Sequence, residues 1–317
     1  MRPSLVFRLT VIFLTLLSFL FLYFFIRKNR GISFNEGSVS LVKNKRVDEV
    51  ENGVSSGKIN LKKEISPLSI PRRERGPIYV DRYDIFRFRR DKKWIFLTFD
   101  GCSLDNCVKP IIGIVEKKRV PVTFFLNGTF IEHFPDSSNL ISKCEFVEVG
   151  NHLYRHVHLT KWEKLHRHIT KDYVNRDFLK RMLLKNEELY FNLTGKRMKK
   201  IWRAPYGETN EEIDEWAHEF GYTHISWTRD YELGETLDTL DWLYDERDER
   251  YKTNFEILDS ILNFGRKRIY GISGGIVLFH LGSKRKKPVY EILPILIDKM
   301  RKRGYKFKWV TQGLKNL

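Results

Sequence analysis

Cysteine is scarce in this sequence, with three residues among 317. Cys102 and Cys107 are close enough along the chain to form one small loop, whereas Cys144 has no second partner. An even framework of disulfides is therefore excluded, and so is a zinc site built from four cysteines. The simplest interpretation is that these thiols are buried or unpaired.

The sequence also lacks a DNA-binding motif, although its formal net charge is +17. Much of that charge is local, because residues 27–93 contain 18 Lys and Arg against 9 Asp and Glu. A general affinity for nucleic acid is therefore not expected, and the basic segment fits a position next to a membrane. A hydrophobic content of 42% excludes a wholly disordered chain.

Charged residues are absent from residues 9–26, an apolar run of 18 residues. As a helix this run would be about 27 Å long, close to the hydrocarbon thickness of a bilayer. We predict an uncleaved transmembrane signal-anchor here, behind a short N-terminal tail at 1–8. A cleaved signal peptide is the alternative, but no small-x-small cleavage site follows the run. Basic residues flank both ends, so the positive-inside rule gives only a weak preference for a cytoplasmic body.

Residues 27–91 show no sustained helical or strand period, which predicts a basic tether with some strand content near its end. The folded body, 92–317, alternates short apolar segments with amphipathic ones. The predicted strands are 94–99, 122–127, 146–150, 200–205, 222–227 and 275–281. The predicted helices are 111–118, 179–195, 211–221, 255–265 and 289–304. Repeated strand–helix units with strands apolar on both faces predict an α/β fold, a parallel sheet closed into a barrel or barrel-like structure.

Ionisable residues follow several predicted strands at the points where those strands end. Asp100 follows the first strand, and His152 and His156 follow the third. Arg203 lies at the end of the fourth strand, and His280 lies in the last. The carboxyl ends of parallel strands meet at one rim of a barrel, where active sites form. We therefore predict that these residues share one site.

His152 and His156 are four residues apart, a spacing that on a helical turn directs both imidazoles to one side. Together they can bind one divalent metal ion, with a carboxylate as the third ligand and water as the fourth. The alternative is a pair of surface histidines, since further histidines follow nearby. Asp100 favours the metal interpretation, because a carboxylate directly after an apolar strand needs a partner.

Five short motifs occur in one order along the folded body. They are LTFD at 97–100, GNHLYRH at 150–156, RAPYGE at 203–208, DTLDW at 238–242 and LFH at 278–280. In this order they resemble the polysaccharide deacetylases of carbohydrate esterase family 4, the NodB-homology domain. The resemblance covers about residues 92–311. It implies a distorted, incomplete (β/α) barrel, which agrees with the predicted strands and helices.

The resemblance also implies how the catalytic residues act. Asp100 would be the general base, and Arg203 would orient it through a charge-assisted hydrogen bond. His280 would be the general acid, held and tuned by Asp241. The implied reaction is hydrolysis of an acetamide, in which the base takes a proton from water and the acid protonates the leaving amine.

The same resemblance implies one bound divalent metal ion, with zinc favoured, and assigns His152 and His156 as its ligands. The ion would polarise the acetyl carbonyl and lower the pKa of the attacking water. Tyr206 would offer its backbone N–H to the oxyanion. Trp242 would wall the substrate groove, and Pro205 would join the substrate-binding residues.

One position departs from the family pattern. The family's first motif usually reads TFDDG, with the second Asp as a metal ligand, whereas this chain has Gly101 there. The missing ligand could be replaced by Asp105 from the same loop, by direct ligation from Asp100, or by water. We favour a retained but weaker metal site, in which Gly101→Asp would raise the affinity. An inactive, metal-free domain that still binds glycan is the alternative.

The sequence as a whole predicts a membrane-anchored, metal-dependent deacetylase of N-acetylated polysaccharide. Its substrate would be peptidoglycan or exopolysaccharide, and its catalytic domain would lie outside the cytoplasmic membrane as a single-pass protein. The expected partners are the N-acetylated glycan and membrane lipid through the N-terminal helix, without nucleic acid, and the chain is expected to be a monomer. Two other functions stay open, a non-catalytic glycan-binding module and a membrane-tethered protein that binds polyanions.

Overall fold

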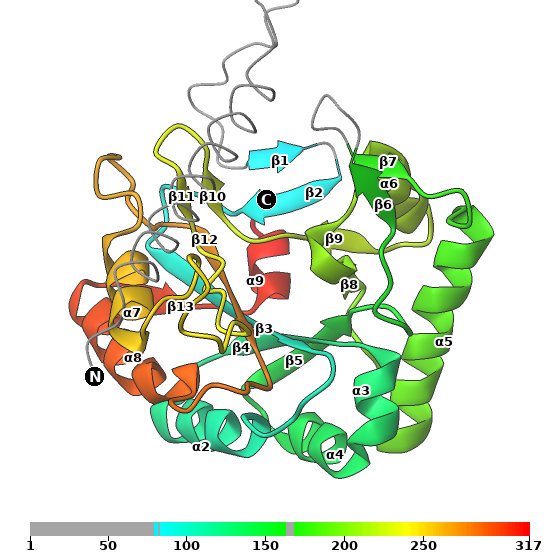
Figure 1. Cartoon of the computed structure of the whole chain (residues 1–317), viewed down its shortest axis with the longest axis horizontal. Coiled ribbons are helices and arrows are strands. Elements are labelled where there is room, and N and C mark those ends of the chain that lie inside the picture. Colours follow the sequence, from blue (N-terminus) through cyan, green and yellow to red (C-terminus); the bar gives the residue numbers. More distant parts are fainter. Residues whose placement is uncertain (1–78, 82, 163–167) are drawn as a thin grey trace, which may run out of the picture. The chain divides into compact units, whose positions relative to one another are not determined.

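Seven strands form a closed ring at the centre of the computed structural model (Figure 1). In ring order they are β2 (Asp84–Arg87), β12 (Gly275–His280), β3 (Trp94–Gly101), β4 (Val122–Leu126), β5 (Val147–Asn151), β8 (Ile201–Trp202) and β9 (Thr223–Ile225). The pairing of β2 with β9 closes the ring. The strand and helix pattern predicted a barrel or barrel-like closure, whereas the family resemblance implied an incomplete barrel. The ring has seven strands and is closed, because β2 lies between β12 and β9.

The structure describes residues 79–81, 83–162 and 168–317, which belong to one compact unit at 70–317. The predicted tail at 1–8, the predicted transmembrane segment at 9–26 and most of the predicted tether lie outside the described residues. Within the described ranges, no helix combines the length and apolar character needed to cross a bilayer.

The folded unit begins before the predicted boundary at residue 92. Strand β1 (Tyr79–Asp81) pairs with β2, and β2 is itself a member of the ring. Ile85 and Phe88 are buried in this segment, with 3% and 1% of their surface exposed. The strand signal in this segment is weak, because charged residues interrupt the apolar ones.

Alternation along β3 separates two hydrophobic layers. Phe96 packs inside the ring with Phe125, Ile225 and Ile276. Leu97 and the other odd-numbered apolar residues of β3 pack outside the ring, in the cluster that includes the helical residues. Because side chains two residues apart share a face, Thr98 and Asp100 continue the inner row toward the carboxyl end of the strand.

Helices surround this ring and cover its outer face (Figure 1). They are α2 (Val108–Lys118), α3 (Gly128–His133), α4 (Pro135–Lys143), α5 (Arg176–Thr194), α6 (Glu211–Glu219), α7 (Asn254–Asn263) and α8 (Leu293–Lys302). Helix α9 (Val310–Leu314) instead packs against the inner cluster of the ring through Val310 and Leu314. Asn175 and Asn210 cap α5 and α6 by accepting a backbone N–H, and Thr253 and Glu256 form a capping box at the start of α7. All five predicted helices are present.

Short elements occupy the loops between these units. Two antiparallel hairpins are formed by β6 (Thr160–Trp162) with β7 (His168–Thr170) and by β10 (Arg229–Asp230) with β11 (Glu235–Thr236). Strand β13 (Lys306–Phe307) pairs with β3, and two 3-10 turns, η1 (Pro205–Gly207) and η2 (Val289–Ile292), complete the elements. Turn η1 carries the RAPYGE motif to the rim of the ring.

Candidate active site

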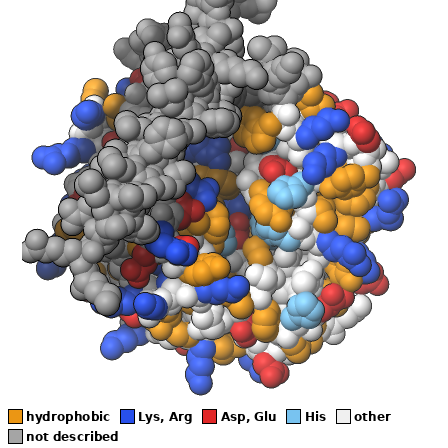
Figure 2. Space-filling model, in the orientation of Figure 1, with side chains coloured by type: hydrophobic (Ala, Val, Ile, Leu, Met, Phe, Trp, Pro, Cys, Tyr) orange, Lys and Arg blue, Asp and Glu red, His pale blue; other side chains and the backbone are white. Residues whose placement is uncertain are grey.

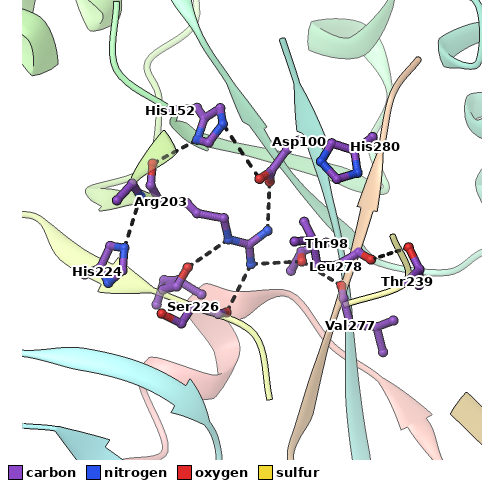
Figure 3. Close-up of polar contacts among 12 residues, drawn as sticks. Thr98, Asp100, His152, Arg203, His224, Ser226, Thr239, Val277, Leu278 and His280 are labelled. Atoms are coloured by element: carbon purple, nitrogen blue, oxygen red, sulfur yellow. Dashed lines mark hydrogen bonds and ion pairs between the residues drawn. The ribbon is translucent and has the colours of Figure 1, made fainter. Parts of the chain in front are cut away.

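Parallel pairing of β3 and β12 brings two ionisable residues together at the rim. Asp100 in β3 is in register with His280, the last residue of β12. Both residues line a cavity of about 430 Å³. Figure 3 shows Asp100, His152 and His280 around one space, with Arg203 beneath Asp100. The sequence prediction of a shared site at the strand ends agrees with this arrangement.

Asp100 is held by a buried arginine. Arg203 Nη1 donates to Asp100 Oδ1 at 2.8 Å, and neither side chain is appreciably exposed. Burial alone would raise the pKa of the Asp100 carboxyl, but the nearby positive charges, first that of Arg203, outweigh it and lower the pKa below its ordinary value. Asp100 is therefore ionised at neutral pH.

Arg203 is fixed by acceptors on three sides. Its Nη2 donates to Thr98 Oγ1 at 2.9 Å and to the Ser226 carbonyl at 3.2 Å, and its Nε donates to the Ile225 carbonyl at 2.9 Å. Its guanidinium lies 4.4 Å from the centre of the Phe125 ring. A fully buried cation of this kind needs such partners, and the geometry leaves it little freedom to turn away from Asp100.

His152 is oriented by the same segment. Its Nδ1 lies 2.9 Å from the Arg203 carbonyl oxygen, so this nitrogen carries the proton and donates. Its Nε2 therefore presents a lone pair, lies 3.7 Å from Asp100 Oδ2, and has no hydrogen-bond partner among the described residues. A buried imidazole whose free nitrogen faces a carboxylate fits a metal ligand, because an orphaned polar atom is otherwise costly.

His156 lies beside His152, with 5.0 Å between the ring centres. The two imidazoles do not come from a helical turn, as the sequence predicted, but from an irregular loop after β5. In that loop Leu153 has φ 60, which turns the chain back sharply. Burial, followed by the charge of His152, lowers the pKa of His156 to about 3. A neutral imidazole is the form that binds metal.

His280 and Asp241 form a second pair on the other side of the cavity. His280 Nδ1 lies 2.7 Å from Asp241 Oδ1, and Asp241 Oδ2 accepts the His280 backbone N–H at 2.9 Å. Burial disfavours the charged imidazole, but Asp241 and the further carboxylates raise the pKa of His280 to about 9. His280 is therefore protonated at neutral pH, in the state opposite to that of Asp100.

Asp105, one of the third ligands considered from the sequence, lies outside the cavity. Its Oδ2 accepts the Ser137 hydroxyl at 2.6 Å. Cys102 lines the cavity instead, and its Sγ and one nitrogen from each of His152 and His156 all lie within 4.8 Å of one another. Burial, and then the charge of Asp100, raise the pKa of the Cys102 thiol well above its ordinary value. A bound cation would oppose that effect.

Gly101 faces away from the site. A Cβ at this position would lie 2.7 Å from Leu126 Cδ2 and 3.1 Å from Leu281 Cδ1, inside the outer hydrophobic layer. This direction argues against the expectation that Gly101→Asp would raise the metal affinity, which stays a prediction. The next residue, Cys102, lines the cavity with Asp100.

Aromatic side chains form much of the cavity wall. Tyr206 has φ 59 and stacks on His158 with 4.0 Å between ring centres, and Pro205 beside it is buried. Trp242 also lines the cavity and is 45% exposed. Figure 2 shows histidine and hydrophobic side chains side by side near the centre of this face.

Some residues of the cavity lie outside the five motifs. They are Cys102, Ser103, Leu104, Trp227, Tyr244, Gly282, Ser283 and Lys284. Trp227 covers Gly207, where a Cβ would lie 2.4 Å from its ring. The position of Cys102, two residues after Asp100, was the available signal for its place in the cavity.

An ionised carboxylate and a protonated imidazole on neighbouring strands are suited to the acid–base chemistry of a hydrolase. Residues 88–225 match the profile of a family described as polysaccharide deacetylase. This segment holds the first three of the five motifs, so the match agrees with their resemblance to the NodB-homology domain of carbohydrate esterase family 4.

Curated relatives of this family include two peptidoglycan deacetylases. The chain is 33% identical over 166 residues to a peptidoglycan-N-acetylglucosamine deacetylase of Bacillus cereus, a match that covers 52% of each protein. It is 27% identical over 231 residues to the peptidoglycan-N-acetylmuramic acid deacetylase PdaA of Bacillus subtilis, covering 72% of this chain and 74% of the relative. The match thus spans only about half the length of the first relative.

The fold is similar to that of solved structures in the same family. One is a family 4 pseudoenzyme from Bacillus anthracis, with a TM-score of 0.57 and 24% identity, covering 74% of this chain and 70% of the other. At this level of identity the likeness concerns the fold, and it agrees with the ring of seven strands described above.

Proposed function

We propose that this chain removes N-acetyl groups from an N-acetylated polysaccharide by metal-dependent hydrolysis. The observation that carries the proposal is that Asp100 and His280 face one cavity from neighbouring strands, each beside a partner of opposite charge. Asp100 has a lowered pKa and His280 has a pKa raised to about 9, so near neutral pH one is a base and the other an acid. Two groups whose environments separate their pKa values in this way are suited to general base and general acid roles.

In the proposed reaction, the oxygen of a water molecule adds to the acetyl carbon while Asp100 accepts a proton from that water. Arg203 keeps Asp100 ionised and aimed at the cavity through its 2.8 Å hydrogen bond. His280 then donates a proton to the amide nitrogen as the C–N bond breaks. The products are acetate and a free amino sugar. His280 has to be a charged imidazolium before it donates, and Asp241 stabilises that charged form.

His152 and His156 would hold one divalent metal ion, with zinc favoured by their nitrogen ligands. When bound, such an ion supplies Lewis-acid polarisation of the amide carbonyl and a lowered pKa for water. The free Nε2 of His152, buried and unpartnered among the described residues, supports this assignment. The backbone N–H of Tyr206 is proposed to bind the developing oxyanion, and the Trp242 and Pro205 side chains to contact the sugar.

Peptidoglycan is the leading substrate, with exopolysaccharide as a second possibility. Two relatives that carry the word peptidoglycan in their names support this choice. The aromatic wall of the cavity fits a sugar ring, whose apolar faces stack on such side chains. We further propose that residues 9–26 anchor the chain as a single-pass membrane protein, with the domain outside the cytoplasmic membrane.

The deciding experiment measures acetate released from N-acetylglucosamine polymers and from peptidoglycan, with and without a chelator. We expect release that stops with the chelator and returns when zinc is added. Location is tested separately. The full-length protein should stay with membranes after a high-salt wash, and protease added to intact spheroplasts should digest the domain.

A non-catalytic glycan-binding module is the second candidate. Gly101 favours it, because the family's second aspartate is missing at that place. This function predicts a chain that binds N-acetylated glycan and releases no acetate even with metal bound. A glycan sedimentation assay, run beside the acetate assay on the same preparation, separates the two functions.

A further inference from the structure

Cys102 lies beside the candidate metal site. It is the first residue after β3, which ends at Gly101. A Cβ at Gly101 would meet Leu126 in the outer hydrophobic layer. The cavity is lined by Asp100 and Cys102 but not by Gly101.

Two imidazoles already stand next to this thiol. Cys102 Sγ, one nitrogen of His152 and one of His156 all lie within 4.8 Å of one another. His152 Nδ1 is engaged by the Arg203 carbonyl, which leaves Nε2 as the nitrogen that can bind a ligand. That Nε2 is buried and has no hydrogen-bond partner in the described part of the chain. The unpartnered Nε2 of His152 is thus a second, independent indication of a metal site next to the thiol.

Asp105, the other candidate for the third ligand on this loop, has a different partner. Asp105 accepts a 2.6 Å hydrogen bond from Ser137 and lies outside the cavity lining. Asp100 is committed to Arg203 through Oδ1, and its Oδ2 lies 3.7 Å from His152 Nε2. Among the described residues, only Cys102 joins the two histidines in a three-ligand cluster.

We propose that the Cys102 thiolate is the third protein ligand of the metal ion, in a Cys–His–His site that replaces the carboxylate ligand of the family pattern. The proposal rests on the proposed function for the existence of the metal centre and goes beyond it in naming this ligand. A thiolate is a soft ligand, so the site should prefer zinc and cobalt to magnesium or manganese more strongly than a carboxylate site would. The missing aspartate would then change the metal preference of the site rather than abolish the site.

Cobalt(II) substitution tests the assignment without relying on activity. We expect the full-length chain loaded with cobalt(II) to show a sulfur-to-cobalt charge-transfer band in the near ultraviolet. Cys102→Ser should lose this band. Cys107→Ser, on the same loop, is the matched control and should keep it, because Cys107 lies buried outside the cavity lining.

Zinc affinity provides a second readout. Cys102→Ser should bind zinc at least about 10-fold more weakly, since even changes behind a ligand cost this much. Cys102→Asp is a second variant, which separates loss of the thiolate from misfolding of the site. It should still bind cobalt, without the sulfur band, and its preference for zinc over magnesium should fall.

The outcomes separate this inference from the proposed function. If His152→Ala loses cobalt while Cys102→Ser retains the charge-transfer band, the metal centre stands and the assignment of Cys102 is overturned. A wild-type chain that binds cobalt without the band overturns it as well. If His152→Ala binds cobalt as tightly as the wild type, the metal centre itself is wrong and both proposals fall.

Discussion

Asp241 holds His280 at two points. Its carboxylate accepts one hydrogen bond from the ring Nδ1–H of His280 and another from the backbone N–H of the same residue. The distances are 2.7 Å from Nδ1 to Oδ1 and 2.9 Å from the backbone nitrogen to Oδ2. The backbone contact fixes where the carboxylate lies, and the ring contact then fixes which nitrogen of His280 carries a proton toward Asp241. Nε2 is left as the nitrogen that can deliver a proton to substrate.

This pair predicts how activity depends on pH. The profile of kcat/KM should be bell-shaped, rising as Asp100 ionises at low pH and falling as His280, with a pKa of about 9, loses its proton. Asp241→Asn removes the nearest negative charge, so the alkaline limb should move to lower pH. An unmoved alkaline limb in Asp241→Asn would assign that limb to another group, such as water on the metal.

The same shift has a consequence for stability. Folding raises the pKa of His280 from 6.5 to about 9. The protonated His280 therefore adds to the free energy of unfolding, fully below about pH 6.5, and this contribution is lost as the pH rises through 9. Asp241→Asn should therefore lower the unfolding temperature more at pH 6 than at pH 10. Thermal unfolding of both proteins across this range checks the sign.

Asp100→Asn should reduce kcat by on the order of 10²-fold or more, the range for loss of general catalysis. Bound metal should be retained if Asp100 acts only as the base, and elemental analysis of the purified variant measures this. Asp105→Asn is the matched control, because Asp105 accepts the Ser137 hydroxyl outside the cavity. Equal losses in both variants would contradict a special role for Asp100.

His280→Ala should slow amide hydrolysis far more than hydrolysis of an activated acetate ester. A good leaving group departs without a proton, whereas an amine needs one. Bound metal should be unchanged, since His280 is not among the three clustered ligand residues. His133→Ala, an exposed histidine of α3, serves as the control. Equal losses on the two substrates would rule out His280 as the acid.

Gly101→Asp should destabilise the domain without strengthening metal binding. The new side chain would collide with Leu126 and leave a carboxylate unpaired among apolar residues, which costs several kcal/mol in comparable cases. Gly113→Asp is a suitable control, because Gly113 lies on the exposed side of α2 with nothing within 4 Å of a Cβ. Thermal unfolding and zinc titration measure the two effects. Tighter zinc binding in Gly101→Asp would overturn the orientation of this residue.

A chain that begins at residue 70 should fold, whereas one that begins at residue 92 should not. The shorter chain lacks β2, which removes the buried Ile85 and Phe88 side chains and exposes the edges of β9 and β12. Each lost side chain is worth about 1.5–3 kcal/mol of burial, and exposed strand edges promote aggregation. Circular dichroism and light scattering of the two chains decide this. A soluble, folded 92–317 fragment would contradict the role of β2.

Much of the fold could be predicted from the sequence because its strands and helices carry strong local patterns. The segment 94–99 is almost wholly apolar, and it lies in β3. The amphipathic segment 179–195 coincides with α5, which ends where Gly195 adopts φ 70. The part that β2 plays in closing the ring could not be predicted, because its pairing with β9 joins segments with no shared local signal.

The position of a site residue could be predicted where it lies at the end of a strand, as for Asp100 and His280. It could not be predicted where the conformation of a loop places the residue. The approach of His156 to His152 depends on the left-handed backbone at Leu153, which the sequence pattern does not reveal. Cys102, for a different reason, could not be predicted from the five motifs, because it lies outside them, two positions after Asp100.

The closed ring also sets an order of events during synthesis. Asp84 of β2 is 140 residues from His224 of β9, to which it bonds at 2.9 Å. At a synthesis rate of about 5–20 residues per second, β9 follows β2 from the ribosome after roughly 7–28 s. Throughout that interval β2 has neither of its neighbours in the ring. Until then β2 can pair only with β1, and closure of the ring has to join the beginning of the domain to its later half.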